Sequence, residues 1–551
     1  MHNFVGCDQN NQKIVPQGEH IVFLTLKKRG KKAKDLENHP DDRLTSLVDT
    51  SWHQPDEPLP SRLEGLRGWI EGEWQHCDDL LLREVDVHGT RVLLIWLRGL
   101  VDLARIEEGV LQPLETLSRR PSDIRQIGSV LHTIHISWIR TWYELNTAVS
   151  DGQVVLHVDG SKLALVLDIS NPPVRAIEKA ENEPTIEGPQ EAFIEHLDLN
   201  IALLRKRIRS PRLKVESMRI GVYSKTTVCI TYIEGIAKPT LVDEARKRLR
   251  KISIDGVNDI NKLRELIGDA PHTLFPTTEE TERPDRVTGS LLQGRISIML
   301  DGAPTSLMVP AQFINFLASA EDYYMNYTLT LFIRILRHIA YWSSLMLPSL
   351  YVALLSYNQD LIPTPLLVSV QAQHRGIPFP TILEALVMMC TFEALREAGT
   401  RLPRSVGQSV SIVGTLIVGD AAVRAGLVSP GMVIVVSGTG VASFALPAYG
   451  FVNSSRIIQF VFVIIAGIFG LVGIVILGLV LVTHLVSLRS FGVPYMAPIA
   501  PFTWSDMKDM FIRVPWFATR QRPDQLEPID RVSNRTPAPR APNHPSNEDQ
   551  S

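Results

Sequence analysis

The stretch Ile457–Val482, IIQFVFVIIAGIFGLVGIVILGLVLV, decides the class of this chain. It contains 26 residues without a charged side chain, and Gln459 is its only strongly polar residue. A helix of this length rises about 39 Å, which is enough to cross the ~30 Å hydrocarbon core of a bilayer with some tilt. We therefore predict a transmembrane helix here. Its glycines would let a neighbouring helix approach closely: Gly467, Gly470, Gly473 and Gly478.

Charge is segregated along the chain of 551 residues. On average 21% of the residues are charged, but only 11 charged residues lie between His338 and Leu488, and no lysine lies between Lys262 and Lys508. A single soluble globule does not segregate its charge in this way. The composition therefore excludes a wholly soluble protein and predicts an α-helical, multi-pass membrane domain over residues 339–488.

A second span is predicted at Ile339–Leu355, directly after Arg334, Arg337 and His338. By the positive-inside rule, these cations place the N-terminal part of the chain in the cytoplasm. Three further apolar segments carry polar groups, and we expect them to face the interior of an assembly. They are Phe379–Leu395, Val406–Val423 and Met432–Tyr449.

The tail conflicts with a count of five spans, which would place the C-terminus outside the cell. Its cations favour the cytoplasm: Arg489, Lys508, Arg513 and Arg520. Either the short, proline-containing segment Leu361–Arg375 also crosses the membrane, or a segment such as 432–449 is re-entrant.

The soluble half contains repeated hairpin patterns, in which two alternating strands flank a turn. The first pattern occurs at Leu81–Trp96 and again at Leu213–Tyr232, and the second at Val154–Leu167 and again at Ile296–Val309. Gly99 and Gly235 are 136 residues apart, and Gly160 and Gly302 are 142 apart. Similar offsets predict two related α/β subdomains, 61–185 and 186–310.

The remaining segments are assigned by composition. Residues 1–60 are polar and predict a disordered arm, without a signal peptide. Residues 311–338 are expected to form an interfacial linker helix. Residues 489–551 are expected to form a cytosolic tail that is disordered after about residue 520.

Sequence motifs for catalysis are lacking. Gly414 and Gly419 have the spacing of a phosphate loop, but the following Lys-Ser/Thr is missing. His132 and His135 share a helical face without a third ligand, and the four cysteines form no paired motif. Cys390 is expected to be a small buried hydrophobic residue. From these missing motifs we predict no enzyme, catalytic residue, metal site or cofactor. The net charge of −3 gives no sign of a nucleic-acid partner, and we predict none.

Two carboxylates fall within the predicted spans. Glu384 and Glu393 are nine residues apart and point to opposite faces of one helix. Glu393 has Arg396 at i+3 and is expected to be paired and structural. Glu384 lies deeper, without such a local partner, and is the better candidate for a functional role.

A polar stripe follows one face of the predicted helix 406–423. It consists of Gln408, Ser411, Thr415 and Gly419, with spacings of three, seven and eleven residues from the first. Val410 and Val413 flank it and are candidates for an apolar gate. The stripe could line a water-filled path, or its small polar groups could simply hydrogen-bond between packed helices.

A series of different short motifs is spread along residues 61–518. They include Glu187-Gly188-Pro189, Thr281–Asp285 (TERPD), Leu300-Asp301-Gly302, Glu321–Tyr324 (EDYY), Leu347–Tyr351 (LPSLY), Leu361–Thr364 (LIPT) and Arg401-Leu402-Pro403. In this combination the chain resembles the A subunits of the GerA family of bacterial spore germinant receptors.

The resemblance implies a membrane subunit of a nutrient receptor that triggers spore germination. It implies a two-part cytosolic N-terminal domain, a location in the inner membrane of the endospore, and two partners: a transporter-like B subunit and a lipoprotein C subunit. It also implies a homo-oligomeric ring, a pentamer, that opens as an ion channel. In such a ring Asp420 would lie near one mouth and attract cations. Relatives often have glutamine at this position, which puts the ion preference in doubt.

Two rival functions belong to other classes. A non-conducting scaffold would dock the other receptor subunits and cytosolic partners through residues 61–310. A secondary transporter would require an inverted repeat in the membrane half, whereas the repeat here lies in the soluble half.

Overall fold

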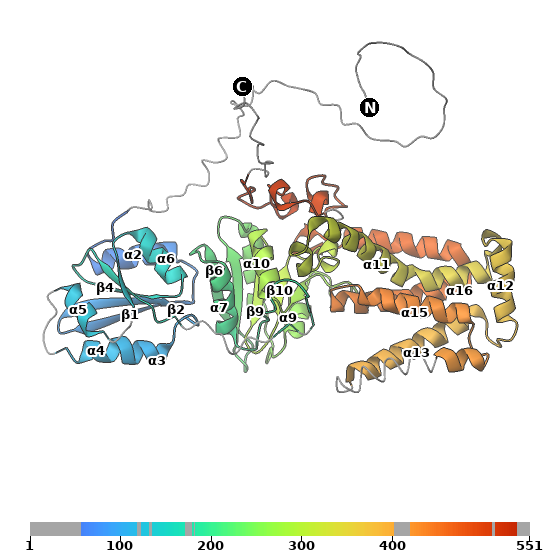
Figure 1. The fold of residues 1–551 in the computed structure, drawn as a ribbon, viewed down its shortest axis with the longest axis horizontal. Coiled ribbons are helices and arrows are strands. Elements are labelled where there is room, and N and C mark those ends of the chain that lie inside the picture. The colour runs from blue at the N-terminus through green and yellow to red at the C-terminus, as the bar shows by residue number, and fades with distance from the viewer. Residues whose placement is uncertain are drawn as a thin grey trace, which may run out of the picture. The chain divides into compact units, whose positions relative to one another are not determined.

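The computed structural model describes residues 57–117, 123–131, 135–170, 179–180, 182–401, 419–509 and 513–536. The predicted arm lies outside these residues except for its last four positions. The helical and α/β parts are drawn in Figure 1.

The first α/β subdomain is built on a five-stranded antiparallel sheet in the order β1-β2-β4-β5-β3. The strands are β1 (Leu80–Val87), β2 (Thr90–Leu97), β3 (Ile136–Ile139), β4 (Val154–Val158) and β5 (Ala164–Leu167). The helices are α2 (Leu63–Glu73), α3 (Leu103–Ile106), α4 (Gln112–Glu115), α5 (Ile124–Val130) and α6 (Trp142–Ser150), with a π-helical turn (Glu107–Leu111) joining α3 to α4. Figure 1 shows α2 and α6 on one face of the sheet and α3 and α4 on the other.

The second subdomain has a five-stranded sheet in the order β6-β7-β9-β10-β8. The strands are β6 (Leu213–Ile220), β7 (Thr226–Ile233), β8 (Glu279–Thr281), β9 (Ile296–Leu300) and β10 (Ser306–Val309). The helices are α7 (Leu197–Arg207), α8 (Pro239–Arg250), α9 (Ile260–Ile267) and α10 (Pro284–Leu292). Alternate side chains of β7 enter two separate cores: Val228 and Ile230 pack with α8 and α9, whereas Cys229 packs with α7 and α10. The sheet is therefore covered on both faces, and β7 is buried continuously from Val228 to Ile233, although successive side chains point to opposite faces.

The two subdomains connect their strands in the same order. Each runs through a helix, a hairpin, further helices, an edge strand, a helix and a second hairpin. Their turns also match, because Asp159 Oδ1 accepts from the N–H of Leu63 at 3.0 Å and Asp301 Oδ1 accepts from the N–H of Leu197 at 3.4 Å. The two sheets thus share one strand order, as two copies of one subdomain require. The subdomain boundaries at 185 and 310 stay predictions.

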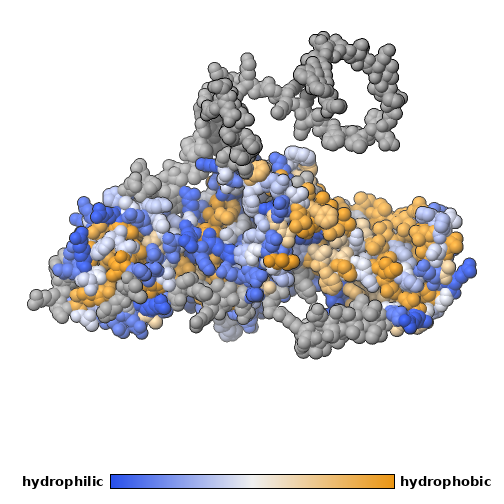
Figure 2. Space-filling model, in the orientation of Figure 1, coloured by the Kyte–Doolittle hydropathy of each residue, from blue (hydrophilic) through white to orange (hydrophobic). Residues whose placement is uncertain are grey.

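The helical part consists of five long or intermediate helices in the described residues. They are α11 (Tyr327–Ser356), α12 (Thr364–His374), α13 (Thr381–Arg401), α15 (Pro430–Phe444) and α16 (Tyr449–Ser487). Two of these, α11 and the 450–487 part of α16, are long and apolar enough to cross a membrane. Figure 2 shows many apolar side chains on the surface of this part. On α16 the strongly exposed ones include Phe469, Val472, Val475, Leu479 and Val480.

The expected linker helix over 311–338 is wrong. This segment contains two 3-10 turns, Phe313–Phe316 and Ala320–Tyr323, and α11 begins at Tyr327 and continues into the predicted span. The break has a local cause, since the Asn326 side chain accepts from the N–H of Thr328 and caps the start of α11.

The predicted span Ile457–Val482 is apolar and helical, but it is not one continuous helix. Gly470 interrupts α16 with φ 62° and ψ −148°, a conformation that is essentially confined to glycine. The ring of Phe275 lies 6.0 Å from that of Phe451 and 6.4 Å from that of His484, so both ends of α16 meet at one place. The element is therefore a helical hairpin, with arms of about 32 and 26 Å.

The chain after α16 packs on the second subdomain. The short strands β11 (Arg489–Ser490) and β12 (Val493–Pro494) form a hairpin, and the Ser490 hydroxyl accepts from the N–H of Ala311 at 2.9 Å. The side chain of Phe491 lies in the core with α8 and α9. The returning arm of the hairpin thus brings the tail back to the soluble part.

The prediction of a disordered tail after about residue 520 is wrong for residues 520–536, which the structure describes as ordered. The N–H of Ile529 donates to Ile236 O at 3.1 Å, and Arg522 Nε donates to Leu292 O at 2.8 Å. Gln521 also pairs with Val532. These backbone partners fix the segment on the second subdomain despite its polar composition.

Candidate functional site

Most of the predicted pore stripe lies outside the described residues. Gln408, Ser411 and Thr415, and the gate candidates Val410 and Val413, all belong to 402–418. Gly419 and Asp420 are described and helical. A Cβ on Gly419 would be 3.5 Å from a methyl group of Val433 in α15, so the end of the stripe packs against that helix.

Asp420 does not present a bare carboxylate. Its Oδ2 lies 2.9 Å from Arg424 Nη2, one turn further along the same helix. Both side chains are more than half exposed, and such a pair is weak in water. Whether this carboxylate attracts cations stays a prediction.

Glu384 lies at a junction of three helices and is fully buried. It comes from the first turn of α13, and its Oε1 accepts from both the N–H and the hydroxyl of Ser429, each at 2.5 Å. Ser429 is the N-cap of α15. The carboxylate thus faces the N-terminal, positive end of the α15 helix dipole.

The second oxygen of Glu384 faces α12. Glu384 Oε2 lies 3.2 Å from Nε2 of His374, the last residue of that helix. On the other side of Ser429, the hydroxyl of Tyr351 lies against Gly431, where a Cβ would approach it to 2.5 Å. We name Glu384, His374, Ser429 and Tyr351 the Glu384 cluster. Its polar contacts join α12, α13 and α15 inside an apolar assembly, and Tyr351 packs α11 against the first turn of α15.

Glu393 is paired, as the i+3 spacing predicts. Its carboxylate lies 3.4 Å from Arg396 and 3.6 Å from Arg456, so it also connects α13 with α16. This arrangement matches a structural ion pair.

A buried aspartate underlies the start of α11. Asp322 lies 3.1 Å from Arg334 Nε and 2.9 Å from Arg337 Nη1. Burial alone would raise the pKa of Asp322, but the two guanidinium groups outweigh it and hold that pKa below its ordinary value. Sequence reasoning used both arginines only as orientation signals and missed their partner. The one available signal was the Glu321–Tyr324 motif.

A second buried network belongs to the second subdomain. Glu279 is fully buried between Arg286 and Arg295, with nitrogen–oxygen distances of 2.6 Å to each. Burial would raise the pKa of Glu279, but the two arginines lower it overall. Glu279 and both arginines lie on β8, α10 and the turn before β9, so the network fixes the edge of the sheet.

Other candidate groups give no site. In the described part of the chain, no group of three or more histidine, cysteine, aspartate or glutamate side chains is arranged to hold a metal ion. His135 is exposed, and His132 lies outside the described residues. The expectation that Cys390 is buried is wrong: it is exposed on α13, where an apolar helix surface suits a lipid environment.

The sequence of this chain has extensive relatives. Residues 69–525 match the family model described as Bacillus/Clostridium GerA spore germination protein. Spore germination protein KA of Bacillus subtilis (strain 168) is 40% identical over 460 residues, which cover 82% of this chain and 85% of that protein. The uncharacterized membrane protein YfkQ of the same organism is 39% identical over 487 residues, which cover 87% of this chain and 94% of that protein.

One solved structure is also similar in sequence. The crystal structure of the N-terminal domain of the A subunit of the Bacillus megaterium spore germinant receptor GerK3 is 30% identical, with a TM-score of 0.38, and covers 47% of this chain and 98% of that chain. Since the family model spans most of its length, the chain belongs to the GerA family of Bacillus and Clostridium spore germination proteins.

Proposed function

We propose that this chain is the membrane subunit of a nutrient germinant receptor and that its copies form a ring that conducts cations when nutrient binds. Relatives such as spore germination proteins KA and B1 of Bacillus subtilis support the receptor role. The transporter-like B subunit and the lipoprotein C subunit are the partners in this proposal. In this proposal the chain is located in the inner membrane of the endospore, with its α/β part in the cytoplasm.

The observation that carries the proposal is the fully buried carboxylate of Glu384 among apolar helices. An ionisable group at membrane depth is expensive and generally serves a polar pathway or a switch. The helix α15 connects this group to the pore stripe, because Ser429 contacts Glu384 and Val433, one turn later, contacts Gly419. A change at the Glu384 cluster would therefore reach Gly419 through α15.

The hairpin in α16 supports a cytoplasmic tail. In this proposal α16 crosses the membrane twice, because its chain returns at Gly470, and the tail then lies on the same side as the α/β part, on which it packs. The cations of the tail then obey the positive-inside rule without requiring that 361–375 cross. The segment α12, with 11 residues, is too short to span a bilayer alone.

The test uses the full chain, with Cys390 replaced by serine, reconstituted in vesicles of phosphatidylglycerol and phosphatidylethanolamine with its partner subunits. Nutrient should start cation release. Cysteines at 408, 411 and 415 should react with a small charged thiol reagent only in the open state, whereas cysteines at 412 and 416 on the opposite face serve as matched controls. Equal labelling on both faces would contradict a pore along this helix. Absence of ion flux from a complex that still captures its partners would favour the scaffold.

A further inference from the structure

The second hairpin turns of the two subdomains can be matched residue by residue. The N–H of Asp159 donates to Arg91 O at 3.0 Å, and the N–H of Asp301 donates to Thr227 O at 2.9 Å. The next glycines donate in the same way, Gly160 to Ser61 O and Gly302 to Glu195 O, both at 2.8 Å. Thr227 therefore stands in the second subdomain where Arg91 stands in the first.

In the first subdomain these positions hold a guanidinium group. Arg91 Nη2 lies 2.9 Å from Asp159 Oδ2 and 2.7 Å from Glu64 Oε1. Glu64 follows Leu63, whose N–H binds Asp159. The guanidinium group of Arg91 is thus bound by two carboxylates. Asp159 lies in the turn between β4 and β5, and Glu64 lies in the first helical turn of α2.

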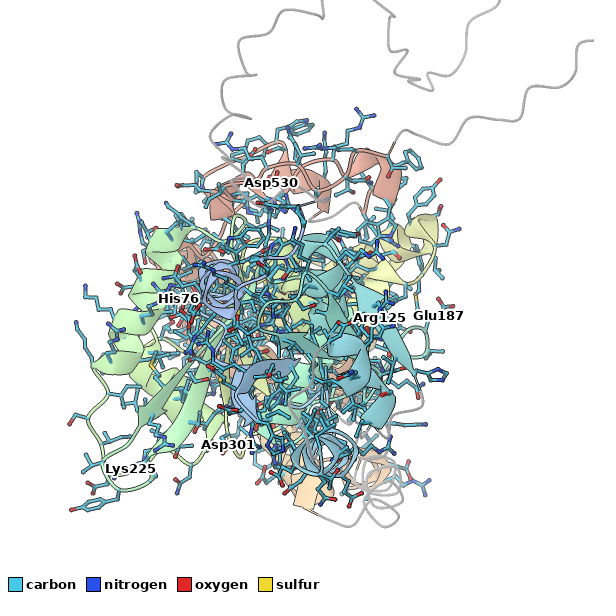
Figure 3. All side chains as sticks on the ribbon, turned by 90° about the vertical axis from the view of Figure 1, so that its left-hand side faces the viewer. His76, Arg125, Glu187, Lys225, Asp301 and Asp530 are labelled. Atoms are coloured by element: carbon cyan, nitrogen blue, oxygen red, sulfur yellow. The ribbon has the colours of Figure 1, made fainter. Side chains whose placement is uncertain are left out.

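The second subdomain keeps the carboxylates and lacks the arginine. Asp198 follows Leu197, whose N–H binds Asp301, so Asp198 and Asp301 correspond to Glu64 and Asp159. In the described residues, no arginine, lysine or histidine forms an ion pair with Asp301, and Arg98 approaches only Asp198, at 3.7 Å. Figure 3 labels Asp301, which lies at the same end of the second sheet as Lys225.

An open cavity of about 420 Å³ lies beside Asp301 and Thr227. Its lining is Arg98, Glu195, His196, Leu197, Asp198, Thr227, Asp301 and Gly302. Three carboxylates face one arginine there, so the charge favours a cation. The volume falls within the range of small-molecule pockets, which run from about 300 to 1,000 Å³.

We propose that this cavity binds the guanidinium group of a small molecule, held by Asp301 and Asp198 as Arg91 is held by Asp159 and Glu64. A planar guanidinium donates parallel hydrogen bonds that match carboxylates, which a compact ammonium does less well. The site is partly open to solvent, so the dissociation constant should be on the order of 1 mM. The proposal concerns the soluble part and does not depend on ion conduction.

The experiment is equilibrium dialysis of the full chain in detergent with radiolabelled methylguanidine. The unchanged chain should bind one molecule. D301N should weaken binding at least about tenfold. T227R should abolish it, because its own side chain then fills the cavity, whereas T227V, which keeps both carboxylates and the small side chain, should bind normally.

The first subdomain supplies the reciprocal variant. R91T should create a second site, so that two molecules bind per chain. Thermal unfolding of each variant reports whether it folds, and T227V and R91T remain informative if T227R does not. Absence of saturable binding by the unchanged chain, or equal binding by D301N and the unchanged chain, would overturn the proposal.

Discussion

Arg205 in α7 donates to both carboxylate oxygens of Asp79, at 2.7 and 2.9 Å, and both side chains are almost completely buried. Asp79 directly precedes β1, so the pair connects the sheet of the first subdomain with a helix of the second. The N–H of Ser217 in β6 also donates to Asp78 Oδ2. The two subdomains therefore meet through charged groups rather than through an apolar surface alone.

The first prediction concerns this pair. D79A leaves the Arg205 guanidinium buried without a counter-charge and should lower the free energy of unfolding by about 3–5 kcal/mol. Chemical denaturation of the full chain measures this change in the free energy of unfolding. The control is R67A, because Arg67 and Glu71 are about half exposed, and its effect on the free energy of unfolding should be much smaller than that of D79A. Equal effects of the two variants would contradict the structural role of the buried pair.

A second prediction concerns pH and Asp322. Since the folded pKa of Asp322 lies below its ordinary value, its charge stabilises the fold above the unfolded pKa of about 4, and this stabilisation is lost as the pH falls through the folded pKa. D322N removes the charge at every pH. The thermal unfolding midpoint of D322N should therefore lie well below that of the unchanged chain at pH 7, and the gap should narrow below about pH 4. A gap that is constant with pH would show that ionisation of Asp322 contributes nothing.

A third prediction tests the helical hairpin. At Gly470 an alanine would have to adopt a backbone conformation that disfavours L-residues, and its Cβ would be 3.0 Å from Tyr357 Cβ. G470A should therefore destabilise the folded chain by about 1–3 kcal/mol. Gly478 is the matched control, because nothing lies within 4 Å of a Cβ there, and G478A should be neutral or slightly stabilising. Similar unfolding midpoints for both variants would argue for a continuous helix.

The hairpins of the soluble half could be predicted from sequence because their signals are local. The turn residues His88-Gly89 and Asp301-Gly302 lie between alternating runs, and both hairpins form there. The break at Gly470 could not be predicted in this way. Four glycines lie in that apolar stretch, and only packing against Tyr357 and Asn358 distinguishes Gly470 from Gly478.

The partners of Glu384 were hidden for a similar reason. Ser429 lies 45 residues away, beyond the range of any helical or strand periodicity. The sequence identified the carboxylate as unusual from its apolar surroundings, but the N-terminus of α15 that receives it is a tertiary feature. By contrast, the pairing of Glu393 with Arg396 follows from helix geometry alone.

The last prediction concerns Glu384 itself. E384Q keeps the size of the side chain but removes the charge that accepts from the N–H and hydroxyl of Ser429 and faces His374. Hydrogen bonds to a charged group are worth about 1.5–3 kcal/mol. If the proposed channel function holds, the variant should therefore shift the balance between closed and open states and change the nutrient-triggered germination rate about tenfold or more. Germination of spores carrying E384Q, with the amount of receptor in the membrane measured in parallel, tests this. T391V is the control, because Thr391 lies on the same helix, is partly exposed and donates to Val387 O in its own helix. A normal rate at a normal amount of receptor would end the case for Glu384 as a functional residue, and loss of the receptor from the membrane would reduce its role to assembly.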